Sequence, residues 1–266
     1  MKFIYAGLIS TLFLLPFVCR AQVSVSPSRI YYKVGAGGSS TQRILLTNPN
    51  DKEVEVAVSV GDWKYDSLGN NLILDAGALR TTCADWIQVL PGSFFTLGPN
   101  ERRELNIVLN VPPGADKSIP VHNAIIFVTQ LNAPPDRTTP GTRFNITLRM
   151  GVKLYHSFVQ PEEKNIEIED FKETNDSTGL ADALALTFRN TGKFWIEGKL
   201  NWELINTLTG EKIKLEGQDI FSLPGDTRIV TKKIPPKVAK GSYTATAVFN
   251  YGSKDDLKIA ELEFVR

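Results

Sequence analysis

Side chains that carry out catalysis are scarce in this chain. Its 266 residues include two cysteines and two histidines, His122 and His156. No Gly-x-Ser-x-Gly or His-Glu-x-x-His motif occurs, and Cys83 has no histidine near it in the sequence. With so few nitrogen and sulfur ligands, a zinc site is not expected. The sequence therefore predicts a protein that is not an enzyme and has no catalytic residue, no metal and no cofactor.

An excess of charge of one sign is also missing. The chain has 30 Lys and Arg residues against 29 Asp and Glu residues. Loss of the N-terminal leader described next would remove Lys2 and Arg20 and bring the net charge close to −1. No basic field is left to attract nucleic acid or an anionic membrane, so we expect neither as a partner.

Only one long hydrophobic run is present, at residues 3–18, and it follows Lys2. This pattern is typical of a secretory signal peptide, here residues 1–21 with cleavage after Ala21. The run is shorter than the roughly 20 residues of a membrane-spanning helix, which makes a permanent N-terminal anchor the weaker alternative. Export with no membrane insertion is predicted. The mature chain then keeps Cys83 alone, which excludes an intramolecular disulfide and fits a small core residue.

From residue 23 onward, short apolar alternations are separated by clusters of Gly, Pro, Asn and Asp, and no helical period persists. This pattern predicts an all-β chain. We expect strands in the first half at 23–34, 43–48, 54–65, 72–74, 87–91, 103–111, 124–131 and 142–155. In the second half we expect them at 166–172, 183–190, 196–205, 212–215, 228–234, 242–251 and 257–265.

The chain also matches itself. The surroundings of Asn48 match those of Asn190, residues 97–100 match 223–226, and residues 111–113 match 234–236. Together with a Pro-containing, charged linker at 159–163, these matches predict two immunoglobulin-like β-sandwich domains in tandem. Their expected limits are 22–158 and 159–266. A Gly-Ser-Tyr run ending at Tyr243 predicts a structural tyrosine corner in the second domain.

Residues 141–158 contain the longest alternation of the chain. The apolar positions, all of one parity, are Phe144, Ile146, Leu148, Met150, Val152 and Leu154. The alternation covers about eleven residues, against about 5–6 for a typical strand. Its apolar face can pack onto the domain's own core, as in most strands, or it can be offered to another protein.

The same stretch carries a resemblance. Bulky apolar residues at Phe144, Ile146 and Leu148 are followed by a Lys-Leu-Tyr run that begins at Lys153, and Arg29 lies in the first expected strand. In these features the chain resembles the periplasmic pilus-assembly chaperones of chaperone–usher fimbriae, specifically over 23–158 and only generically beyond. The family often has Arg-Pro just after its Lys-Leu run, and the residues at that point here are different.

The resemblance implies a periplasmic chaperone of two immunoglobulin-like domains whose partners are pilin or fimbrial subunits. An outer-membrane usher is a further partner of the family, which the sequence itself does not identify. Arg29 and Lys153 would lie together between the domains and bind the C-terminal carboxylate of a subunit. Strand 142–155 would complement the subunit as a donor strand through Phe144, Ile146 and Leu148. Because side chains alternate along a strand, the carboxylate anchor would fix the register.

Two other interpretations remain open at this point. One is a structural or adhesive sandwich protein of the cell envelope without chaperone activity, in which the long strand packs internally. The other is a carbohydrate-active or carbohydrate-binding module, which requires exposed aromatics with nearby carboxylates on one face, a platform that Trp63, Tyr65 and Trp86 could form. His156, next to the proposed anchor, is interpreted as a partly buried structural histidine, with a pH-sensing role as the alternative.

Overall fold

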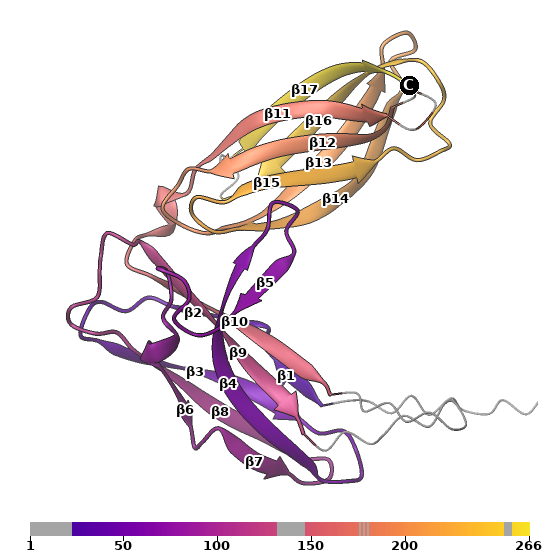
Figure 1. The fold of residues 1–266 in the computed structure, drawn as a ribbon. Coiled ribbons are helices and arrows are strands. Elements are labelled where there is room, and N and C mark those ends of the chain that lie inside the picture. Colours follow the sequence, from indigo (N-terminus) through magenta and orange to yellow (C-terminus); the bar gives the residue numbers. More distant parts are fainter. Residues whose placement is uncertain (1–22, 132–146, 176, 178, 180, 253–256) are drawn as a thin grey trace, which may run out of the picture.

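The computed structural model describes residues 23–131, 147–175, 177, 179, 181–252 and 257–266 (Figure 1). Within these ranges the helical elements are two single 3₁₀ turns, Ala84–Trp86 (η1) and Pro161–Glu163 (η2), and the remaining elements are strands. The all-β prediction is confirmed. The predicted leader at 1–21 lies outside the described residues, and so do Phe144 and Ile146.

The first sandwich is built from the strands that precede residue 158. They are β1 (Ser24–Ser26), β2 (Arg29–Tyr32), β3 (Ser39–Thr47), β4 (Val54–Tyr65), β5 (Asn71–Leu74), β6 (Ile87–Leu90), β7 (Phe94–Leu97), β8 (Arg102–Asn110), β9 (Val121–Gln130) and β10 (Arg149–Ser157). One sheet has the order β1-β3-β8-β6, and the other has the order β2-β10-β9-β4-β5 with β7 paired to β4. Alternate residues of each strand fill the core between the sheets, as Ile44 of β3 and Leu105 of β8 do with no exposed surface.

The second sandwich uses the strands that follow η2. They are β11 (Ile166–Asn175), β12 (Ala181–Asn190), β13 (Ile196–Asn206), β14 (Lys212–Ser222), β15 (Thr227–Lys233), β16 (Ser242–Asn250) and β17 (Leu257–Val265). The sheets β11-β12-β15 and β14-β13-β16-β17 enclose a separate core that includes Phe188 and Phe249. Tyr243 donates a hydrogen bond from its hydroxyl to the carbonyl of Ala239 at 3.0 Å, which confirms the tyrosine corner. Both domains are therefore immunoglobulin-like sandwiches.

Several strand predictions need correction. Strand β3 begins at Ser39, four residues before the expected 43, and the strand expected at 212–215 in the second domain extends to Ser222 as β14. The stretch 23–34 forms two strands in different sheets, β1 and β2, which are separated at Pro27, a residue without a backbone donor. Strand β7 was not predicted, because its four residues lie in a short run between turn residues. Strand β10 ends at Ser157, two residues later than expected. It begins at Arg149, although the carbonyl of Leu148 still accepts a 2.9 Å hydrogen bond from the backbone of Gln130.

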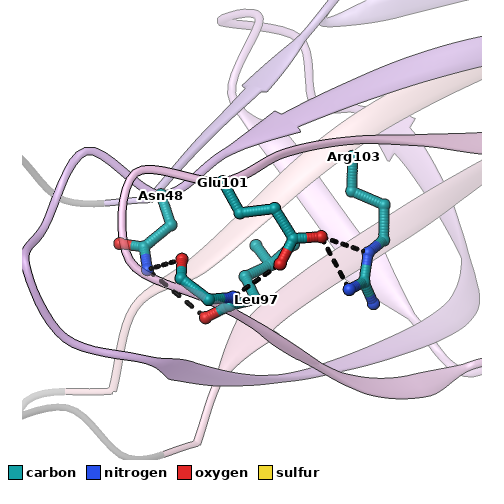
Figure 2. Close-up of polar contacts among 5 residues, drawn as sticks. Asn48, Leu97, Glu101 and Arg103 are labelled. Carbon is teal, nitrogen blue, oxygen red and sulfur yellow. Dashed lines mark hydrogen bonds and ion pairs between the residues drawn. The ribbon is translucent and has the colours of Figure 1, made fainter.

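The internal match corresponds to the same hydrogen-bond arrangement in each domain. Asn48 is fully buried, and its side-chain amide donates to the carbonyl oxygens of Leu97 and Gly98, at 3.4 and 2.8 Å (Figure 2). The turn that follows Leu97 is closed by the carboxylate of Glu101, which accepts a 2.6 Å hydrogen bond from the backbone of Gly98. Figure 2 also shows Arg103 pairing with this carboxylate, at 2.6 Å.

In the second domain, Asn190 is likewise fully buried and donates to the carbonyl of Ser222 at 3.5 Å. Asp226 accepts a 2.7 Å hydrogen bond from the backbone of Leu223, as Glu101 does from Gly98. The structural equivalence therefore pairs Gly98 with Leu223. This is one residue away from the match expected from the sequence, which pairs 97 with 223.

Candidate functional site

Arg29 and Lys153 are brought together by the one parallel pairing of the described strands. Strand β2 runs parallel to β10 with Arg29 opposite Lys153, and the backbone of Lys153 donates to the carbonyl of Ser28 at 3.0 Å. Paired residues of neighbouring strands project to the same face of a sheet. The two cations of the sequence hypothesis therefore lie on the same face of their sheet, next to the second domain.

Lys153 is half-buried, and its ammonium lies between aromatic rings and polar side chains of the first domain. Its ammonium donates hydrogen bonds to the hydroxyl of Tyr65 at 2.9 Å and to Oδ1 of Asn71 at 2.7 Å. It also lies 4.0 Å from the ring centre of Trp63 and 4.2 Å from that of Tyr65. Burial, and then the positive charges of Arg29 and Arg228, lower the pKa of Lys153 from 10.5 to about 8.

Arg29 reaches the second domain. Its guanidinium carbon lies 3.9 Å from the ring centre of Phe221, which belongs to β14. The Nε atom of Arg29 is buried, and no described residue accepts a hydrogen bond from it. A buried guanidinium nitrogen without an acceptor is costly, so this atom can gain from a ligand that brings an oxygen.

The cations at this junction form no ion pair among the described residues. Across the described ranges, no carboxylate oxygen lies within 4.0 Å of a charged nitrogen of Arg29, Lys153 or Arg228. The charges of Arg29 and Arg228 both lower the pKa of Lys153. Chemically, such a site favours an anion with hydrogen-bond-accepting oxygens, for which a carboxylate is suited.

An aromatic cluster joins the two domains beneath these cations. Tyr155 packs between Trp63 and Trp195, with ring centres 5.4 and 5.2 Å away. Tyr31 stacks on both Tyr155 and Trp195, and its hydroxyl donates to the carboxylate of Glu197. Trp63 has no exposed surface. It therefore cannot belong to the exposed aromatic platform that a carbohydrate-binding module requires, and this interpretation is wrong in that respect.

The proposed donor residues are placed only in part. Leu148 is half-buried at the start of the described segment, whereas Phe144 and Ile146 lie outside it. Farther along the same face, Val152 and Leu154 are fully buried in the core of the first sandwich. The alternation thus serves the domain's own core from residue 150 onward, and its role before Leu148 stays a prediction.

His156 and His122 lie away from the cation cluster, in a buried aromatic group with Trp86 and Phe158. A ring nitrogen of His156 is 2.8 Å from the carbonyl oxygen of Val34. Burial lowers the pKa of both histidines, to about 4 for His122, so both rings are neutral near pH 7. This agrees with a structural histidine. Cys83 is fully buried, as expected, and burial raises the pKa of its thiol.

Sequence reasoning did not connect Trp63, Tyr65, Asn71 and Arg228 with the site of Arg29 and Lys153. Trp63 and Tyr65 end a regular alternation, and Asn71 follows a turn, so each has an ordinary local explanation. Arg228 belongs to the second domain, where the sequence offered no family motif. What makes these residues part of one site is the contact between domains, which no local pattern encodes.

In the described ranges, no group of three or more His, Cys, Asp and Glu side chains is arranged to hold a metal ion. In the same ranges, no helix has the length and apolar character needed to cross a membrane.

No model of a known protein family matches the sequence, and no curated protein matches it. Several of the solved structures similar to it are pilus chaperones. The chaperone–tip adhesin complex of CsuC and CsuE from Acinetobacter baumannii is 14% identical, with a TM-score of 0.48 over 91% of this chain and 98% of that chain. The E. coli chaperone DraB is 18% identical, with a TM-score of 0.44 over 91% and 98% of the two chains. The chaperone SafB of Salmonella enterica, in complex with the pilin SafA, is 17% identical, with a TM-score of 0.43 over 92% and 96%.

Proposed function

We propose that this chain is an exported, periplasmic chaperone that binds fimbrial subunits by donating strand 142–155 and anchoring the subunit's C-terminal carboxylate on Arg29 and Lys153. The observation that carries the proposal is the pairing of these two cations on neighbouring strands with no carboxylate within 4.0 Å among the described residues. The Lys-Leu-Tyr motif that first suggested this role begins at Lys153.

The anchor works through charge-assisted hydrogen bonds. A carboxylate between Arg29 and Lys153 would accept from the ammonium and from guanidinium nitrogens, each bond contributing about 1.5–3 kcal/mol. The lowered pKa of Lys153 would rise when the carboxylate arrives, because an opposite charge favours the protonated ammonium. Binding would therefore be tightest below pH 8, where the lysine is already charged, and would weaken as the pH rises above that value.

The edge of β10 supplies a place for the incoming strand. Strand β2 pairs with β10 from Lys153 to His156 only, so residues 149–152 have β9 on one side and no strand partner on the other among the described strands. Unpaired backbone groups of this kind are a template for strand addition. An added strand lying in line with β2 would end at Arg29, with its carboxylate beside Lys153. It would run parallel to β10.

The donor side chains would add to the binding free energy that the carboxylate anchor supplies. In the proposal, Phe144, Ile146 and Leu148 fill the groove of a subunit that lacks a strand, each contributing about 1.5–3 kcal/mol before the costs of ordering. A one-residue slip would turn all three away from the groove. A fixed carboxylate position prevents that slip, so the anchor and the donor residues depend on one another.

The proposal is tested by affinity capture from the envelope of the source organism. The tagged mature chain is compared with an Arg29→Ala/Lys153→Ala double variant, and co-purifying proteins are identified by mass spectrometry. A small, β-rich secreted subunit that is retained by the wild type and lost with the folded double variant is expected. Equal capture by both proteins would leave the structural or adhesive sandwich as the better interpretation.

A further inference from the structure

The hairpin between β4 and β5 reaches from the first sandwich to the second (Figure 1). The backbone of Ile229 in β15 donates a 2.7 Å hydrogen bond to the carbonyl of Ser67 at the hairpin tip. The tip itself is preorganised, because the Asp66 carboxylate accepts hydrogen bonds from the backbones of Leu68 and Asn70, at 2.9 and 2.8 Å. A rigid loop is thus docked on a strand of the other domain.

Arg228 of the second domain contacts this hairpin at Tyr65 and Gly69. Its side chain is 6% exposed, its Nη1 donates to the carbonyl of Phe221, and its guanidinium carbon lies 4.9 Å from the ring centre of Tyr65. Gly69 lies directly on it. A Cβ at Gly69 would be 1.9 Å from Nη2 and 2.8 Å from the guanidinium carbon of Arg228. The close approach of Arg228 therefore requires glycine at position 69. The φ of Gly69 is +90°, a conformation that residues with a side chain rarely adopt.

The same hairpin carries both hydrogen-bond partners of the Lys153 ammonium. Tyr65 is the last residue of β4, and Asn71 is the first residue of β5. The guanidinium of Arg228 lies over the ring of Tyr65. The hydroxyl of the same tyrosine accepts a hydrogen bond from the ammonium of Lys153. A continuous set of contacts therefore runs from β15 of the second domain to the lysine on β10 of the first.

We propose that Arg228 is a positioning residue for the anion site: by holding hairpin 65–71 against the second sandwich, it fixes Tyr65 and Asn71 and, through them, the ammonium of Lys153. It is not itself a ligand in this arrangement, because its guanidinium is covered by the hairpin and engaged with Phe221. The anion site is then complete only when the two sandwiches are docked. The identity of the anion rests on the proposed function, whereas the positioning of Lys153 does not.

The charged groups near Arg228 differ from those near Lys153, as expected if Arg228 positions Lys153. Asp226 and Asp66 act electrostatically on Arg228, whereas Arg29 and Arg228 are the charges that act on Lys153. Arg228 is thus partly balanced by carboxylates of its own surroundings. Lys153 is left facing cations, hydroxyl and amide groups.

The experiment uses the full mature chain and reads Lys153 directly. Competitive labelling of amines with acetic anhydride across a pH series, followed by mass spectrometry, gives the pKa of Lys153 in each variant. Gly69→Ala is the key change, because it displaces the contact with Arg228 while all three cations remain. We expect the pKa of Lys153 to rise from about 8 toward 10.5 in Gly69→Ala, because displacement of the hairpin lets water reach the ammonium. Arg228→Gln should raise it as well, but this variant also removes a positive charge that acts on Lys153, so Gly69→Ala decides the test.

Gly77→Ala is the matched control. Gly77 also has a positive φ, of +84°, and lies just after the same hairpin, but an added Cβ there meets nothing within 4 Å. It should leave the pKa of Lys153 unchanged. Arg228→Lys keeps a donor and a charge at this position, and we expect it to restore much of the wild-type value. An unchanged Lys153 in Gly69→Ala would overturn the inference, even if Arg228→Gln fails to fold.

Partner capture, run separately on the same variants, keeps the two proposals distinguishable. If Gly69→Ala shifts Lys153 and also reduces capture of the subunit at least tenfold, both proposals are supported. If Lys153 shifts but the wild type captures no subunit, the positioning role stands and the chaperone proposal fails. If capture depends on Arg29 and Lys153 while Gly69→Ala leaves the Lys153 pKa unaltered, the chaperone proposal stands and the positioning role fails.

Discussion

The ammonium of Lys153 donates a 2.9 Å hydrogen bond to the hydroxyl of Tyr65 and lies 4.2 Å from the centre of the same ring. A single tyrosine thus contacts the lysine through both its hydroxyl and its ring, and this fixes the direction in which the charge points. Such a fixed cation is suited to recognition, because little side-chain entropy is left to lose when a ligand arrives.

Removing this cation should impair binding and leave the fold intact. Lys153→Ala is expected to weaken subunit binding by about 2–4 kcal/mol, because a buried charge-assisted bond to the carboxylate is lost. Binding is measured by titration with the captured subunit, and folding is checked by circular dichroism and thermal melting. Unfolding of the variant would mean that the lysine is structural, contrary to the proposal.

The free protein should become more stable when the lysine is replaced by an apolar side chain of similar length. The pKa of Lys153 is about 8 in the fold and 10.5 when unperturbed, so the charged form is destabilised by burial. After allowance for partial solvent screening, Lys153→Met should raise the free energy of unfolding at pH 7 by roughly 1–2 kcal/mol. Urea denaturation of both proteins measures this difference.

The pH dependence of that difference has a definite sign. Between pH 8 and 10.5 the unfolded state binds more protons at Lys153 than the folded state does. Wild-type stability from this group therefore rises with pH across that window, and the advantage of Lys153→Met should shrink. An advantage that is constant from pH 7 to pH 10 would show that burial of the charge is not its cause.

The donor-strand interpretation predicts dependence on parity. An aspartate at Leu148, on the apolar face, should weaken subunit binding, whereas an aspartate at the adjacent Thr147 should have little effect. Thr147 is exposed and Leu148 is half-buried, so both positions can be tested without disturbing the fully buried core. Affinities of Leu148→Asp and Thr147→Asp for the captured subunit are compared. Equal losses would argue against an inserted apolar face.

The two buried asparagines should each stabilise their own domain. Asn48→Ala removes the side-chain donor to the carbonyl of Lys52 and one of the two donors to the carbonyl of Gly98, and Asn190→Ala removes the side-chain donor to Phe194. Each change should cost about 2–4 kcal/mol. Hydrogen exchange should show lost protection in the strands of the first sandwich for Asn48→Ala and of the second for Asn190→Ala. Loss confined to the other domain in either case would contradict the equivalence.

The sequence predicted most of the architecture, because alternation reports directly which side of a strand faces a core. It placed the strand 54–65 with its correct bounds and paired Asn48 with Asn190 from their surroundings alone. It failed at 23–34, where one apolar stretch supplies two sheets, because the pattern is the same whichever sheet a residue joins.

For the site, Arg29 and Lys153 came from a family resemblance, and the structure places them in register. The residues that position Lys153 could not be predicted in the same way. Tyr65 and Asn71 act there because of a hairpin that folds back near β10, and Arg228 acts because the second domain docks on that hairpin. Contacts of this kind depend on the placement of whole domains, which alternation and turn residues do not specify.

The central claim, that Arg29 and Lys153 bind a C-terminal carboxylate, is tested most directly by a thermodynamic cycle. A peptide with the C-terminal sequence of the captured subunit is titrated calorimetrically, once as the free acid and once as the amide, into the wild type and into Arg29→Ala/Lys153→Ala. Amidation is expected to weaken binding to the wild type by about 2–4 kcal/mol and to make no difference to the double variant. Equal binding of the acid and the amide to the wild type would contradict the claim.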